Sequence, residues 1–139
     1  MRAVATAVVP VPPDQVWAVL ADHEAMSSWG PGVTVTVTKE GVAERNGVGA
    51  VRKIAAAGPA PAVIEEITRF DPGTALGYKA LAGAPLKNYR GLVELSPVGE
   101  GTQIAWSISA DQRLPLAEKA VAKTIATVLL RLLVRAVKK

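Results

Sequence analysis

The longest regular pattern in the sequence lies at its end, where residues 116–137 read LAEKAVAKTIATVLLRLLVRAV. At 3.6 residues per turn, one set of apolar side chains in this stretch shares an arc of about 140° around a helix. The set comprises Val121, Ile125, Val128, Leu129, Leu132, Leu133 and Ala136. The stretch therefore predicts a long amphipathic helix whose apolar arc covers one face of a sheet.

The preceding sequence supplies that sheet. Residues 33–38 read VTVTVT, and apolar and polar residues that alternate with a period of two indicate a strand with one buried face. Short segments between turn-forming residues predict further strands at residues 3–9, 49–55, 62–70, 75–81, 88–95 and 102–110. The short connections favour antiparallel hairpins over parallel crossover units.

Two short helices are predicted between the first two strands. Pro12, Pro13 and Asp14 suit the first turn of a helix that runs to Leu20. Asp22 is a suitable N-cap for a second helix at residues 24–29, which the sequence GPG at 30–32 ends. The element order predicts a single α+β domain over residues 1–139, with seven antiparallel strands and one long C-terminal helix.

Composition limits the chemistry that such a domain can perform. The chain has 139 residues, of which 50% are hydrophobic and 20% charged, and these values exclude wholesale disorder. It contains no cysteine and one histidine, His23, so disulfides, thiolate sites and multi-histidine metal sites are excluded. We expect no metal and no cofactor, and the cytoplasm is the expected compartment.

The positive charge is concentrated in the C-terminal helix. The net charge is +4, yet residues 115–139 alone carry +5 and the first 114 residues carry −1. No aromatic residues lie among these cations, which argues against nucleic-acid binding. Leu130, Val134 and Val137 fall outside the apolar arc, among Lys123, Arg131 and Lys138. This mixed face suits peripheral contact with an anionic membrane, packing in a homodimer, or an ordinary solvated surface.

The order of these elements and motifs resembles the SRPBCC, or START-like, superfamily, and within it the polyketide cyclase/dehydrase and lipid-transport group. The matching features are VPPDQVW at 11–17, residues 22–32, GVGAVR at 47–52, residues 65–72, Tyr78, Asn88-Tyr89, Gly101-Thr102 and Trp106. The resemblance implies a helix-grip fold, in which a curved seven-stranded antiparallel sheet wraps around the C-terminal helix and encloses a cavity. Small residues at inward positions, Ala80, Gly91 and Ala110, favour that cavity over a filled core.

Strand alternation points several polar side chains into the same interior. If the apolar members of each strand face inward, so do Arg52, Glu65, Tyr78, Tyr89 and Trp106. Lone buried charges are very costly, so Arg52 and Glu65 are expected to pair across neighbouring strands. The functional interpretation is a polar end to an apolar pocket that orients a ligand carbonyl or hydroxyl. The alternatives are a purely structural ion pair, or an Arg52 that reaches solvent beside Glu66.

Two further residues lie near the cavity mouth that the resemblance implies. His23 is a candidate hydrogen-bond donor or acid/base group, although beside Asp22 and Glu24 it also fits an exposed loop residue. Trp29 is a candidate entrance residue or, alternatively, an anchoring residue of the core.

Three functions remain open at this point. The first is binding of a hydrophobic small molecule such as a lipid, a polyketide-like compound or an isoprenoid. The second is an enzyme, a polyketide cyclase, aromatase or dehydratase that uses Arg52, Glu65 and a tyrosine. The third is a dimeric or toxin–antitoxin-like interaction domain without ligand chemistry. The sequence contains no nucleophile elbow of the form GxSxG and identifies no catalytic residue.

Overall fold

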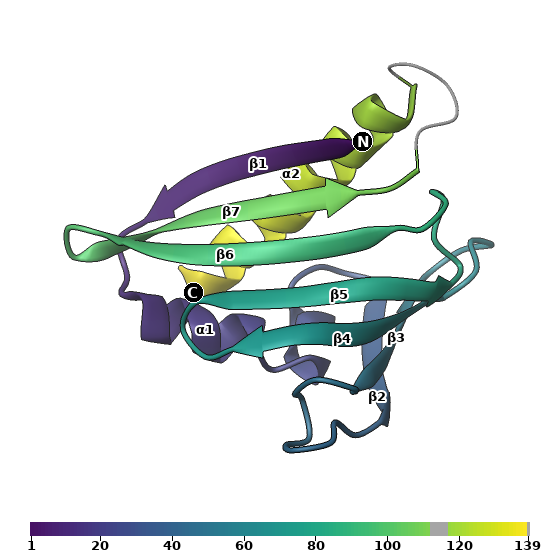
Figure 1. Ribbon diagram of the computed structural model, residues 1–139, viewed down its shortest axis with the longest axis horizontal. Coiled ribbons are helices and arrows are strands. Elements are labelled where there is room, and N and C mark those ends of the chain that lie inside the picture. Colours follow the sequence, from purple (N-terminus) through teal and green to yellow (C-terminus); the bar gives the residue numbers. More distant parts are fainter. Residues whose placement is uncertain (112–116, 139) are drawn as a thin grey trace.

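The computed structural model describes residues 1–111 and 117–138 and consists of one sheet, two α-helices and a 3₁₀ helix (Figure 1). The elements in chain order are β1 (Arg2–Val9), α1 (Pro13–Leu20), the 3₁₀ helix η1 (Glu24–Ser28), β2 (Val33–Lys39), β3 (Val51–Ala56), β4 (Val63–Asp71), β5 (Ala75–Ala82), β6 (Arg90–Val98), β7 (Gly101–Ser109) and α2 (Ala117–Val137). The predicted strands and helices are thus confirmed. Leu116, the expected first residue of the long helix, lies outside the described residues.

The seven strands form one antiparallel sheet in the order β1-β7-β6-β5-β4-β3-β2. Consecutive strands from β2 to β7 are neighbours, and β1 is placed beside the last strand. The amino group of Met1, just before β1, donates to the carbonyl of Ala110, just after β7, at 2.8 Å. This hydrogen bond links the start of the first strand to the end of the last one. The strands β1 and β2 are therefore the two edges, and the α+β fold class predicted from the sequence is confirmed.

Backbone conformation makes two strands begin two residues later in the sequence than predicted. The strand expected from residue 49 begins at Val51, because Gly49 adopts a left-handed φ of +91°. The strand expected from residue 88 begins at Arg90, because Asn88 has a φ of +53°. A left-handed residue turns the chain out of the extended conformation and so sets the start of each strand.

The long helix α2 lies across one face of the sheet and packs on β1, β7 and α1 (Figure 1). Its buried residues are Ala122, Ala126, Leu130 and Leu133. The predicted apolar arc is correct only in part. Leu133 is buried, and Ile125, Leu129, Leu132 and Ala136 pack against the core while half-buried. Val121 and Val128, however, are 42% and 48% exposed, whereas Leu130, outside the arc, is buried. The buried face is turned by about 90° from the centre of that arc.

Small side chains explain why α2 presents this face. Ala122 and Ala126 are completely buried, and Ala3 and Ala5 are buried on β1, the strand against which α2 packs. Alanine on both elements lets the two backbones approach closely, which larger side chains would prevent.

Within the described residues, no helix is long and apolar enough to span a bilayer.

One of the small inward residues does not leave empty space. A Cβ atom at Gly91 would overlap the phenol ring of Tyr78, which lies directly over this glycine. The prediction that Gly91 contributes to a cavity is therefore wrong, because an aromatic ring from the neighbouring strand occupies the position. Ala110 is buried but is not a member of the hydrophobic core cluster, and Ala80 is half-buried against that cluster.

Candidate functional site

The structure gathers all seven predicted site residues into one buried region inside the fold. Each has an exposed fraction of 5% or less. His23 and Trp29 flank η1, and Tyr89 directly precedes β6. The other members are Arg52 on β3, Glu65 on β4, Tyr78 on β5 and Trp106 on β7. We call these seven side chains the interior cluster.

An ion pair forms the centre of the interior cluster. Arg52 and Glu65 are direct partners in the β3–β4 register, so their side chains leave the sheet on the same face. Arg52 donates from Nε to Oε1 of Glu65 at 2.9 Å, and its Nη2 forms an ion pair with the same oxygen at 2.8 Å. The guanidinium carbon also lies 5.0 Å from the centre of the Tyr78 ring. Arg52 is 2% exposed, so the alternative in which it reaches solvent is wrong.

His23 is held in a single tautomer by its two neighbours. Its Nε2 lies 2.8 Å from the carbonyl oxygen of Asn46, which can only accept, so Nε2 carries the proton. Its Nδ1 therefore accepts from Nη1 of Arg52 at 3.2 Å. Burial and the positive charge of Arg52 lower the pKa of His23 to about 4. The expectation of an exposed loop histidine is wrong, because His23 has no exposed surface.

The aromatic members pack against one another and share hydrogen bonds. Trp106 Nε1 donates to the hydroxyl of Tyr78 at 3.1 Å. The rings of Tyr78 and Tyr89 lie 6.2 Å apart, and Trp29 meets Trp106 edge-on at 6.5 Å. Burial raises the pKa of Tyr78 far above its ordinary value and raises the pKa of Tyr89 to about 12. Both phenols are therefore protonated at neutral pH.

Two buried polar atoms of this region have no hydrogen-bond partner among the residues that the structure describes. They are Nε1 of Trp29 and Oδ1 of Asn46. Leaving a buried donor or acceptor unsatisfied costs about 1–3 kcal/mol, so each is a place where a water or a ligand atom would bind. Trp29 is 3% exposed, so it is an anchored residue of the interior that presents an unused donor.

Sequence reasoning missed two contributors to the region. Met26, on η1, brings its sulfur within 3.3 Å of Arg52 Nη1. Asn46 supplies the carbonyl that fixes the His23 tautomer. Neither a methionine in a short helix nor an asparagine in a turn carries a sequence signal for such a role. In residues 1–111 and 117–138, no group of three His, Asp or Glu side chains could hold a metal ion.

Space for a ligand lies beside the interior cluster. A hollow of about 220 Å³ extends from the loop between β5 and β6 to Tyr89 and includes half-buried Ala80 and Leu86. Beside its fully buried face, α2 carries a row of apolar side chains that are only half-buried or are exposed. We call this row, Val121, Ile125, Val128, Leu129 and Leu132, the α2 apolar stripe. A Cβ added to Gly30, just after η1, would lie 3.5 Å from Cδ2 of Leu132, so the stripe runs beside the η1 region.

Solved structures share this fold across almost the whole chain. The protein TTHA0849 from Thermus thermophilus superposes with a TM-score of 0.74 at 22% identity, covering 99% of this chain and 97% of that one. The Aha1 dimer from Colwellia psychrerythraea gives 0.75 at 16%, with coverages of 99% and 96%. A START superfamily protein from Mycobacterium smegmatis gives 0.75 at 15%, with coverages of 97% and 92%. At these identities the likeness establishes the helix-grip fold alone.

Sequence comparison adds the family. Among curated proteins no sequence matches this chain. The family model described as polyketide cyclase / dehydrase and lipid transport matches residues 1–138. The match spans the sheet, both short helices and α2, so it agrees with the resemblance noted from the motifs. This chain belongs to the polyketide cyclase/dehydrase and lipid-transport family of the START-like SRPBCC superfamily.

Proposed function

We propose that this domain binds a hydrophobic small molecule, such as a lipid, a polyketide-like compound or an isoprenoid. In this proposal the ligand lies between the α2 apolar stripe and the hollow at Tyr89, with its polar end toward the interior cluster. The observation that carries the proposal is the orientation of α2. The helix buries Ala122, Ala126, Leu130 and Leu133 and leaves the five side chains of the α2 apolar stripe half-buried or exposed. A separate hollow borders Tyr89, a predicted site residue.

Burial of the stripe would supply the binding energy. Fully removing a valine or leucine side chain from water stabilises by about 1.5–3 kcal/mol. Val121 and Val128 are 42% and 48% exposed, and Ile125, Leu129 and Leu132 are half-buried, so each still has surface to lose. A ligand without much polar surface is the partner that this row of side chains would favour.

The interior cluster would orient such a ligand. Nε1 of Trp29 is a buried donor without a partner among the described residues, and a ligand carbonyl or hydroxyl oxygen could accept from it. The charges of Arg52 and Glu65 already neutralise each other at 2.8 Å, so the cluster offers a neutral polar end and not a site for an ion. All seven side chains then contribute, Trp29 by donating and the others by fixing its surroundings.

The competing function, a cyclase, aromatase or dehydratase, would require a general acid or base. At neutral pH His23 is uncharged and its Nδ1 lone pair is occupied by Arg52, while the raised pKa values of Tyr78 and Tyr89 keep both phenols protonated. Efficient proton transfer needs a group whose pKa lies near the working pH. These electrostatics favour binding over catalysis.

The test is titration with a neutral, environment-sensitive dye such as Nile red. Leu129→Gln and Leu132→Gln, which make the stripe polar, should each weaken dye binding by about tenfold, which corresponds to 1.4 kcal/mol. Val42→Gln is the matched control, since Val42 is 91% exposed and lies outside both the stripe and the hollow. Equal affinities for all three variants and the parent protein would refute the proposal.

A second copy of the chain could also cover the α2 apolar stripe, which is the dimeric alternative. Sedimentation of the unliganded protein at the titration concentration separates the two occupants. A monomer that binds the dye supports the proposal. A stable dimer that Leu129→Gln dissociates, and that does not bind the dye, would contradict it.

A further inference from the structure

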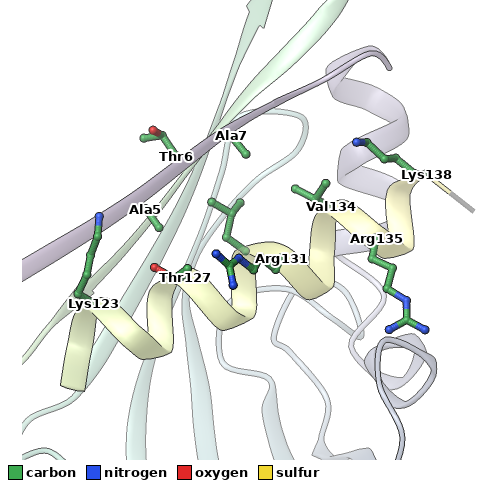
Figure 2. Close-up of a pocket in the computed structure, with 10 residues that line it drawn as sticks. Ala5, Thr6, Ala7, Lys123, Thr127, Arg131, Val134, Arg135 and Lys138 are labelled. Atoms are coloured by element: carbon green, nitrogen blue, oxygen red, sulfur yellow. The ribbon is translucent and has the colours of Figure 1, made fainter. Parts of the chain in front are cut away.

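A groove separates the edge strand β1 from α2, on the outside of the helix-grip core (Figure 2). Its volume is about 690 Å³, within the range of about 300–1,000 Å³ that small-molecule sites occupy. It is lined by Ala5, Thr6, Ala7, Lys123, Thr127, Leu130, Arg131, Val134, Arg135 and Lys138. On α2, these residues centre about 140° from the α2 apolar stripe, measured over the solvent-exposed side of the helix, and about 220° from it, measured over the buried face. The groove is therefore separate from the ligand space proposed above.

The charge of the groove has one sign. Four of the lining side chains, Lys123, Arg131, Arg135 and Lys138, are cations, and none is an acid. In the part of the chain that the structure describes, none of the four forms an ion pair, whereas Arg45, Arg52, Arg69 and Lys79 all do. Unpaired cations around a concave surface raise the local concentration of anions. The groove thus favours a ligand with negative charge.

The rest of the lining is mainly apolar. Ala5 and Ala7 on β1 are small, and they leave room beside Val134 of α2 (Figure 2). Leu130 of α2 also lines the groove. Leu130 is almost fully buried, so it forms a fixed wall. A purely inorganic anion would leave this apolar surface uncovered. An apolar tail joined to an acidic head would match both kinds of lining.

We propose that the groove binds an anionic amphiphile, a long-chain carboxylate, as a second site distinct from the ligand site proposed at the α2 apolar stripe. Its head is held by Arg131, which lies near the middle of the groove between Thr127 and Val134 (Figure 2). Its tail rests on Ala5, Ala7 and Leu130, which line the same groove. A guanidinium can donate two parallel hydrogen bonds to one carboxylate, a geometry that a lysine cannot reproduce. Lys123 and Lys138 add positive charge at the two ends.

Two observations favour a discrete amphiphile over larger partners. The groove is concave, and a flat bilayer could not reach the apolar residues between strand and helix. An extended peptide added to β1 would need the free backbone groups of this edge strand, but Lys123 Nζ already donates to the carbonyl of Val4. A single molecule inserted between Lys123 and Lys138 has no such competitor.

The test uses monomeric oleate and its uncharged methyl ester, with affinities measured by calorimetry. Arg131→Glu should weaken oleate binding at the groove at least tenfold, and Arg131→Gln should weaken it less. Lys119→Glu is the matched control, because it makes the same charge change at an exposed position of α2 that does not line the groove. The methyl ester should be insensitive to all three variants. Oleate should also shift the methyl NMR signals of Ala5 and Ala7.

The possible outcomes of these measurements distinguish the groove from the ligand site proposed at the α2 apolar stripe. The groove proposal is supported if Arg131→Glu loses oleate affinity while Lys119→Glu keeps it, and if both variants bind Nile red as the parent protein does. This result supports the groove whether or not a ligand also binds at the α2 apolar stripe. Equal losses of oleate affinity in Arg131→Glu and Lys119→Glu would mean general charge attraction and would overturn the proposal. Binding to anionic vesicles without binding of monomeric oleate would overturn it as well. If only Leu129→Gln lowers the affinity for oleate, the carboxylate binds at the α2 apolar stripe, and the groove proposal is overturned.

Discussion

Lowering the pH from 7 to 5 should destabilise the fold through His23, the single histidine of the chain. In the unfolded chain His23 titrates near its ordinary pKa of 6.5, whereas in the fold its pKa is about 4. Between these values the unfolded state binds a proton that the folded state refuses, so stability falls as the pH falls. At and above pH 7 the side chain is mostly neutral in both states, and the penalty is nearly absent.

The size of the effect follows from the two pKa values. Linkage gives a loss of about 2 kcal/mol between pH 7 and pH 5, rising toward about 3 kcal/mol near pH 4. The physical cause is that a proton on Nδ1 would displace the hydrogen bond from Arg52 and would place two positive charges about 3 Å apart in a buried region.

Urea unfolding at pH 7 and pH 5, followed by tryptophan fluorescence, measures this loss. The control is His23→Gln, which cannot titrate in this range and should show a much smaller difference between the two pH values, whatever its absolute stability. NMR of the single imidazole ring reports the folded-state pKa directly. A ring that titrates near pH 6.5, or a His23→Gln variant with the full pH dependence, would refute the reasoning.

Two further predictions concern the packing of the interior. Arg52→Met alone should lower the free energy of unfolding by about 3–5 kcal/mol, because it leaves the Glu65 carboxylate buried without its partner, and adding Glu65→Leu should recover much of the loss. Chemical denaturation of Arg52→Met, Glu65→Leu and the double variant measures this, and losses that add in the double variant would contradict it. Gly91→Ala should cost about 1–3 kcal/mol because its methyl group would overlap the Tyr78 ring, whereas Gly30→Ala, whose nearest new contact is 3.5 Å, should cost clearly less. Equal melting temperatures for the two alanine variants would show that the Tyr78 ring moves aside freely.

The sheet and five members of the interior cluster could be predicted because they depend on a period of two, whereas His23 and Trp29 lie outside the strands, on either side of η1. Once the apolar residues of a strand are taken as buried, the direction of every polar residue on the same strand follows. That reasoning brought Arg52 and Glu65 to one face, and the direct Arg52–Glu65 register in the structure agrees with it. The need to neutralise buried charge then predicted their ion pair.

The orientation of α2 could not be predicted in the same way. Its sequence carries two apolar rows, and a count of large side chains favours the row with Ile125, Leu129 and Leu132. The structure buries the row with Ala122 and Ala126, since close approach to β1 depends on how small the facing residues are on both elements. The residues of two elements that face each other are set by tertiary packing, and the sequence of one segment alone does not determine them. The same holds for Gly91, whose space is filled by a ring from another strand.

The most direct test of hydrophobic ligand binding is native mass spectrometry of the purified protein, recorded beside the Leu129→Gln and Val42→Gln variants. We expect the parent protein and Val42→Gln to carry a bound apolar molecule, or to take up an added neutral hydrophobe at one equivalent, and Leu129→Gln to lose most of it. Organic extraction of the complex would identify the molecule. Repeated absence of any adduct in the parent protein, with and without added hydrophobe, would contradict ligand binding at the α2 apolar stripe.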